Sequence, residues 1–87
     1  MQTTIFISGQ PNGNRKLANA IATRDSETNN AGFGNYQIIF KTKSEAKKAL
    51  WNGYLSLKEN EPEFVRKDDY SAKYGTLSYD ASSATIY

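Results

Sequence analysis

The fold is decided by the segment Thr42-Lys-Ser-Glu-Ala-Lys-Lys-Ala-Leu-Trp-Asn-Gly-Tyr-Leu-Ser-Leu57, whose small and apolar residues recur at helical spacing. The resulting stripe consists of Ala46, Ala49, Leu50, Gly53, Tyr54 and Leu57. Thr42 precedes Glu45 by three residues, the spacing of a capping box in which each side chain binds a free backbone N–H at the helix start. Pro62 lacks the N–H that would continue the helix. The sequence therefore predicts one amphipathic helix over about 43–60.

Other segments favour β-strands, because β-branched and aromatic residues dominate or alternate in them. These are residues 3–8, residues 33–40 and a hairpin over 70–87, whose turn is Asp80-Ala-Ser-Ser83 and whose last strand is expected at the sheet edge. Residues 9–14 and 25–32 are rich in Pro, Gly, Asn and Asp, which favour turns and loops.

Segment 15–24 is ambiguous. Its alternation favours a strand, whereas its alanines and the spacing of Leu17 and Ile21 suit a helix. We expect a strand, since a meander through residues 3–8, 15–24 and 33–40 needs only short connections.

These elements predict a single α+β domain over residues 1–87. Its small antiparallel sheet has about four to five strands in βββαββ order and packs against one main helix, about 43–60. Gly53 lies on the apolar stripe of that helix, so we expect a close approach to the sheet there. One sheet face is left uncovered unless the C-terminal segment or a second copy of the chain, as a homodimer, covers it.

The composition argues against most enzymes. The chain has no His and no Cys, so it lacks the commonest general base, a thiolate nucleophile, disulfides and the usual zinc ligands. The acids of residues 59–69 are expected in a solvated loop. We therefore expect no catalytic residue, no metal site and no cofactor. The N-terminus resembles neither a secretion signal nor a membrane anchor, which favours a cytoplasmic protein with no membrane partner.

The candidate interface combines rings on the uncovered sheet face with lysines at the helix start. Its members are Phe6, Phe33, Ile39, Tyr74, Lys43, Lys47 and Lys48, and Tyr87 is a further ring expected on this face. Cations are mildly unfavourable at a helix N-terminus, so these lysines hint at an acidic or phosphate-bearing partner. A net charge of +2 is too small to require one, and an ordinary solvated helix face would explain the lysines as well.

Two short segments resemble RNA-recognition-motif domains. Ile5-Phe-Ile-Ser-Gly-Gln-Pro11 looks like the first conserved strand of that family. Gly32-Phe-Gly34, the strand ending at Phe40 and the helix with Glu45-Ala46 and Ala49-Leu50 look like its third strand and second helix. The resemblance implies that Phe6 and Phe33 stack on bases. It departs from the family pattern because we expect too little room between the two strands for the family's first helix and second strand.

We interpret the chain as a small non-catalytic binding protein, whose partner is expected to be another protein. In size and style it is similar to accessory proteins of phages and mobile elements that inhibit host factors, such as anti-CRISPR proteins. The alternative is a single-stranded RNA- or DNA-binding domain that uses the sheet aromatics and the helix lysines.

Overall fold

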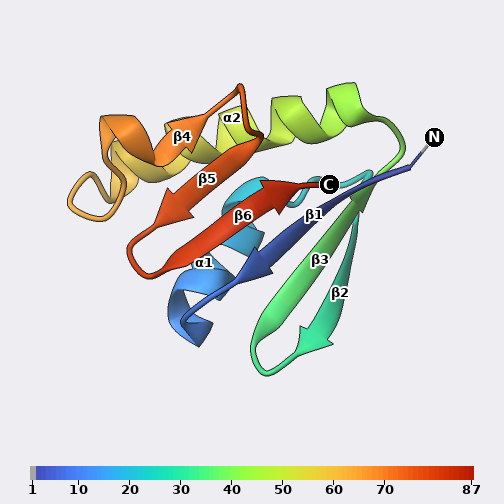
Figure 1. The fold of residues 1–87 in the computed structure, drawn as a ribbon, viewed down its shortest axis with the longest axis horizontal. Coiled ribbons are helices and arrows are strands. Elements are labelled where there is room, and N and C mark those ends of the chain that lie inside the picture. The colour runs from blue at the N-terminus through green and yellow to red at the C-terminus, as the bar shows by residue number, and fades with distance from the viewer. Residues whose placement is uncertain (1) are drawn as a thin grey trace.

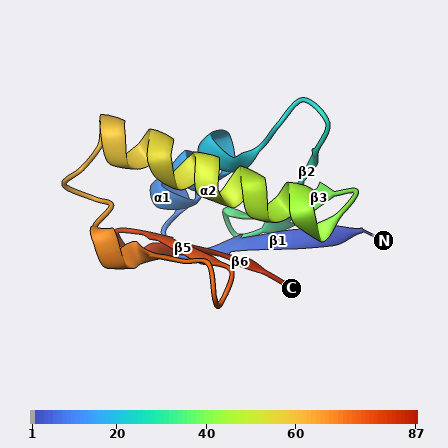
Figure 2. The ribbon, with the colours of Figure 1, turned by 90° about the horizontal axis from the view of Figure 1, so that it is seen from above.

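The computed structural model describes residues 2–87, in which two helices lie on one face of a six-stranded antiparallel sheet (Figures 1 and 2). The elements are β1 (Thr3–Ser8), α1 (Pro11–Ile21), β2 (Glu27–Gly32), β3 (Asn35–Phe40), α2 (Lys43–Asn60), a 3-10 turn (Lys67–Asp69), β4 (Tyr70–Ser71), β5 (Thr76–Tyr79) and β6 (Ser82–Ile86). The strand order across the sheet is β2-β3-β1-β6-β5-β4. The α+β class is confirmed, whereas the predicted numbers of strands and helices are only roughly matched.

The predicted helix over 43–60 is α2. The Thr42 hydroxyl accepts a hydrogen bond from the backbone N–H of Glu45 at 3.1 Å, which caps the helix start. The buried residues of α2 are the six of the predicted stripe. The close approach at Gly53 is made to α1 and not to the sheet, because a Cβ there would lie 2.9 Å from Cγ1 of Ile21.

The predicted turn over 9–14 and strand over 15–24 are wrong, because α1 begins at Pro11 and runs to Ile21. Proline suits the first helical position, because a backbone N–H at that position would make no hydrogen bond within the helix. Leu17, Ala18 and Ile21 are buried on one side of α1. Packing of this stripe against the sheet and α2 therefore outweighs the local preference for a turn.

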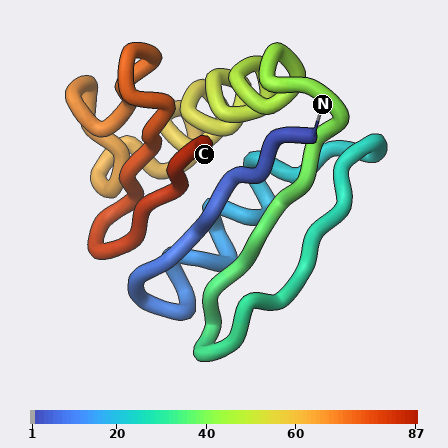
Figure 3. The backbone as a smooth tube through the Cα atoms, turned by 45° about the vertical axis from the view of Figure 1, so that its right-hand side comes forward, coloured from blue at the N-terminus to red at the C-terminus, as the bar shows by residue number. Residues whose placement is uncertain are grey.

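The loop predicted over 25–32 contains β2, which pairs with β3 at the sheet edge. Figure 3 shows β3 running between β1 and this outer strand. The meander and the βββαββ order are therefore wrong. Residues 9–34 also hold both a helix and a strand, so the expected lack of room is wrong too.

The elements β1-α1-β2-β3-α2-β6 form a βαββαβ unit with β1 and β3 in the middle of its sheet, the split βαβ arrangement. The hairpin predicted over 70–87 is present as β5 and β6. Its last strand is not at an edge, because β6 pairs with both β1 and β5.

The hydrophobic core lies between the helices and the sheet. From the sheet come Ile5, Ile7, Ile38, Phe40, Leu77 and Ala84, and from the helices Leu17, Ile21, Ala46, Leu50 and Leu57. Seen from above, both helices lie on the same side of the strands (Figure 2). The opposite face of the sheet is therefore uncovered within residues 2–87.

Candidate binding surface

The uncovered side of the sheet, here called the open face, is defined by strand alternation. Side chains of neighbouring residues in a strand point to opposite faces. Because Ile5, Ile7, Ile38 and Phe40 point into the core, their neighbours point outward. The open face thus carries Thr4, Phe6 and Ser8 of β1, Asn35, Gln37 and Ile39 of β3, and Ser83 and Thr85 of β6.

Phe6 lies in the middle of this face. Its cross-strand neighbours are Gln37 on β3 and Thr85 on β6, and the same row continues to Asn29 on β2 and Thr76 on β5. An aromatic ring is thus flanked on one side by amides and on the other by hydroxyls. Each of these groups can both donate and accept hydrogen bonds.

The Phe6 ring meets the ring of Tyr87 edge to face, with centroids 5.0 Å apart and an interplanar angle of 86°. Phe6 is 38% exposed and Tyr87 is 79% exposed. Both line an open depression of about 590 Å³ together with Asn35 and Ala31. The open face therefore offers an apolar spot surrounded by polar side chains.

The other predicted interface residues are spread over several places. Ile39 lies on the open face, half-buried, as predicted from alternation. Phe33 lies in the turn between β2 and β3 and not on the face; its side chain is 100% exposed and its φ is +56°. Tyr74 lies in the connection between β4 and β5 and is 68% exposed.

The three predicted lysines fall into two groups. Lys43 and Lys47 line a small pocket of about 110 Å³ together with Lys73, Tyr74 and Tyr87. Lys48 lines a different hollow, whose walls include Asp25 and Glu45. The structure therefore places Lys43 and Lys47 beside the aromatic residues and Lys48 away from them.

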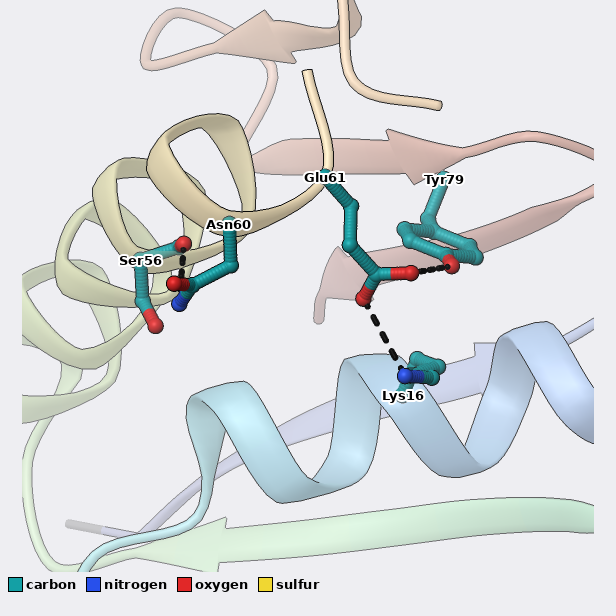
Figure 4. A network of polar contacts seen from close by, with 5 residues as sticks. All are labelled: Lys16, Ser56, Asn60, Glu61 and Tyr79. Carbon is teal, nitrogen blue, oxygen red and sulfur yellow. Dashed lines mark hydrogen bonds and ion pairs between the residues drawn. The ribbon is translucent and has the colours of Figure 1, made fainter. Parts of the chain in front are cut away.

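The most perturbed titratable groups bridge three elements and lie away from the open face. The Tyr79 hydroxyl donates to Oε1 of Glu61 at 2.8 Å, and Nζ of Lys16 lies 3.3 Å from Oε2 of the same carboxylate (Figure 4). Burial, followed by the hydrogen bond to Glu61, raises the pKa of Tyr79 to about 12. The hydrogen bond from Tyr79 lowers the pKa of Glu61 against a smaller opposing effect of desolvation.

This network joins the end of α2 to β5 and α1. The end of α2 is also held by Asn60, whose side-chain amide donates to the backbone oxygen of Ser56 at 3.0 Å (Figure 4). Glu61, which we expected in a solvated loop, instead accepts two polar contacts. Its carboxylate accordingly has a role in the packing of these three elements.

Two further properties concern the described part of the chain. Among residues 2–87, no cluster of three acidic side chains has the geometry to hold a metal ion. Neither helix of this stretch is long and apolar enough to cross a lipid bilayer.

Sequence reasoning missed three residues of this surface. Gln37 and Thr85 flank Phe6 only because of the strand register, which a single strand does not reveal. Lys73 was not singled out because it lies far along the chain from Lys43 and Lys47. The alternation of residues 33–40 did place Gln37 opposite to the core, and that signal could have identified it.

The chain matches no protein-family model, and it has no match among the curated proteins or the solved structures with which it was compared.

Proposed function

We propose that this protein is a non-catalytic binding module whose open face holds single-stranded nucleic acid. The observation that carries the proposal is the exposed ring of Phe6 on a central strand of an uncovered sheet, flanked by Gln37 and Thr85. Aromatic rings on such surfaces bind unpaired bases by stacking, and neighbouring amides and hydroxyls bind the edges of these bases.

The charges at this surface suit a phosphate backbone. The eight residues of the open face on β1, β3 and β6 include no Asp or Glu, and the acidic Glu27 lies out on the edge strand β2. Lys43, Lys47 and Lys73 line a pocket together with Tyr87, whose ring contacts Phe6 on the open face. A backbone crossing the face would therefore meet cations at its border and no carboxylate in the middle.

The resemblance to RNA-recognition-motif domains supports the same proposal for Phe6. That family reads bases on a four-stranded sheet, and the βαββαβ unit here supplies such a sheet with Phe6 on β1. Phe33 does not share this role, because it lies in the hairpin turn. Gln37 occupies the face position on β3 beside Phe6, so the ligand would meet fewer rings and more hydrogen-bonding groups.

The test measures binding of fluorescently labelled single-stranded RNA and DNA oligonucleotides by anisotropy at low salt. Phe6→Ala should weaken binding by about 1–3 kcal/mol, or about 5- to 150-fold in Kd, because one stacking partner is lost. Phe33→Ala is the matched control, since it removes an exposed ring away from the face and should leave the Kd unchanged. Absence of oligonucleotide binding by the unmodified protein at low salt would overturn the proposal.

A protein partner is the second candidate, and the geometry of Phe33 favours it. A positive φ is uncommon and energetically costly for a bulky residue such as Phe33. Burial of the Phe33 side chain does not offset this cost, because the side chain is fully exposed. A fully exposed ring on a hairpin turn can act as an anchor that fills a pocket of a partner. An inhibitor of a host factor would be one form of this candidate, and a homodimer through the same ring is another.

The two candidates predict opposite results for the same pair of variants. A protein partner recovered by affinity capture from nuclease-treated extract should be lost with Phe33→Ala and retained with Phe6→Ala. Nucleic-acid binding should show the reverse pattern. If both variants retain every captured partner, the hypothesis that Phe33 anchors a partner protein is wrong.

A further inference from the structure

A small pocket beside the open face gathers three lysines from distant parts of the chain. Lys43 and Lys47 come from the first turns of α2, and Lys73 comes from the connection between β4 and β5. Tyr74 and Tyr87 complete the walls, and no Asp or Glu lines this pocket. The pocket is thus lined by three lysines and by no carboxylate.

These lysines form no ion pair within residues 2–87. The ion pair found in that part of the chain joins Lys16 to Glu61, at another site. Lys43 and Lys47 also lie near the positive end of the α2 dipole, where cations are unfavourable. Nζ of Lys73 lies 5.3 Å from the centroid of the Tyr74 ring, so this tyrosine holds one cation at the pocket rim. An external anion in this pocket would be attracted by all three lysines.

Tyr87 connects this pocket to the open face. Tyr87 lines both the depression around Phe6 and the lysine pocket. Its ring contacts that of Phe6 at a centroid distance of 5.0 Å. A ligand stacked on Phe6 can therefore continue past Tyr87 to the lysines along one surface.

We infer that Lys43, Lys47 and Lys73 form a phosphate-binding subsite that holds the backbone of a single-stranded nucleic acid whose base stacks on Phe6. This inference rests on the proposed function and adds the path of the ligand, from the centre of the sheet over Tyr87 to the start of α2. Lys48 has no part in it, because its hollow contains Asp25 and Glu45.

The test is the salt dependence of oligonucleotide binding by the full chain. For single strands, the slope of log K against log salt concentration is about −0.7 per neutralised phosphate. The triple variant Lys43→Gln, Lys47→Gln, Lys73→Gln should therefore reduce the magnitude of that slope by about 2. Lys48→Gln is the matched control on the same helix and should leave the slope unchanged. Thermal unfolding of each variant establishes that its fold is intact.

Phe6→Ala separates the subsite from the proposed function. It should weaken binding by a similar factor at every salt concentration, since stacking releases no counterions. If the triple variant binds with the unmodified slope while Phe6→Ala still weakens binding, the phosphate subsite is wrong and the nucleic-acid function survives. If the unmodified protein binds labelled oligoglutamate through these lysines and no oligonucleotide, both proposals are wrong.

Discussion

Asn14 of α1 donates a hydrogen bond from its side-chain amide nitrogen to the backbone oxygen of Gly34 at 2.8 Å. The same nitrogen lies 3.3 Å from the backbone oxygen of Gly9 and 3.2 Å from Oδ1 of Asn35. Asn14 is fully buried. One side chain in the first turn of α1 therefore holds together the end of β1 and the start of β3, next to the hairpin turn that carries Phe33.

Asn14→Ala is expected to destabilise the protein by about 1–2 kcal/mol, because the backbone oxygens of Gly9 and Gly34 lose the donor that they share. Chemical denaturation with urea measures the change. Asn12→Ala is the control, since Asn12 is exposed and its amide oxygen accepts from Arg15 on the helix surface at 3.0 Å. A loss for Asn14→Ala no larger than that for Asn12→Ala would show that this amide does not hold the elements together.

Asn14→Asp should cost more than Asn14→Ala at neutral pH. The new carboxylate would be buried opposite three oxygen acceptors and would have no proton to donate. Its pKa would rise above that of a free Asp, so the deficit should shrink as the pH falls toward about 4 and the carboxyl group becomes a donor. Urea denaturation at neutral and acidic pH measures this trend, and an equal deficit at both pH values would contradict it.

Part of the fold follows from local sequence signals. The strand over residues 3–8 and the helix over 43–60 are found where they were predicted, because alternation and a capped apolar stripe are properties of a single segment. The first helix was missed because Pro11, Asn12 and Gly13 resemble a turn. Gly13 is instead favoured by packing, since a Cβ there would overlap Oγ of Ser82.

The second strand carries no apolar signal at all. Residues 27–31 are exposed, and the segment is a strand because its backbone pairs with β3. The residues of the candidate surface also fall into two groups, those predicted from one segment and those brought together only by the fold. Phe6 and Ile39 follow from alternation, whereas the meeting of Lys43, Lys47 and Lys73 depends on how the chain returns to the start of α2. Pairing and tertiary contacts of this kind are not encoded in any one segment.

Gly53→Ala tests the contact between α1 and α2. Alanine in place of glycine in a helix normally stabilises by about 1 kcal/mol. Here the added Cβ would lie 2.9 Å from Cγ1 of Ile21 and 3.3 Å from the backbone oxygen of Ala20, so we expect a net destabilisation of about 1–2 kcal/mol. Ser56→Ala, at an exposed position of the same helix, is the control and should be neutral or slightly stabilising. Thermal and urea unfolding distinguish these outcomes, and a more stable Gly53→Ala variant would mean that the helices can separate at no cost.

Phe33→Asn tests the strained turn. Asn tolerates positive φ better than Phe does, and the Phe33 side chain is fully exposed, so its removal costs no burial. We expect the free energy of unfolding to rise by about 0.5–1 kcal/mol. Tyr74→Asn is a comparison at another exposed ring without positive φ and should give no such gain. A destabilised Phe33→Asn variant would mean that the ring contributes to the fold itself.

The Tyr79–Glu61 hydrogen bond predicts how stability depends on pH at the alkaline end. The pKa of Tyr79 is raised to about 12, above its ordinary value of 10.0. The unfolded chain therefore loses the tyrosine proton at lower pH than the folded protein does. The contribution of Tyr79 is fully present below pH 10 and is lost as the pH rises from about 10 to about 12.

At acidic pH, stability falls as the pH is lowered, because the pKa of Glu61 is lowered in the folded protein. Its contribution is present above the pKa of an unfolded glutamate and is lost as the pH falls through the lower folded value. Tyr79→Phe removes the donor to Glu61 and should cost about 1 kcal/mol at neutral pH. It should also flatten both ends of the stability profile measured by urea unfolding between about pH 3 and about pH 12. Tyr74→Phe, at an exposed ring, is the matched control, and identical profiles for the two variants would show that the bond between α2 and β5 does not stabilise the fold.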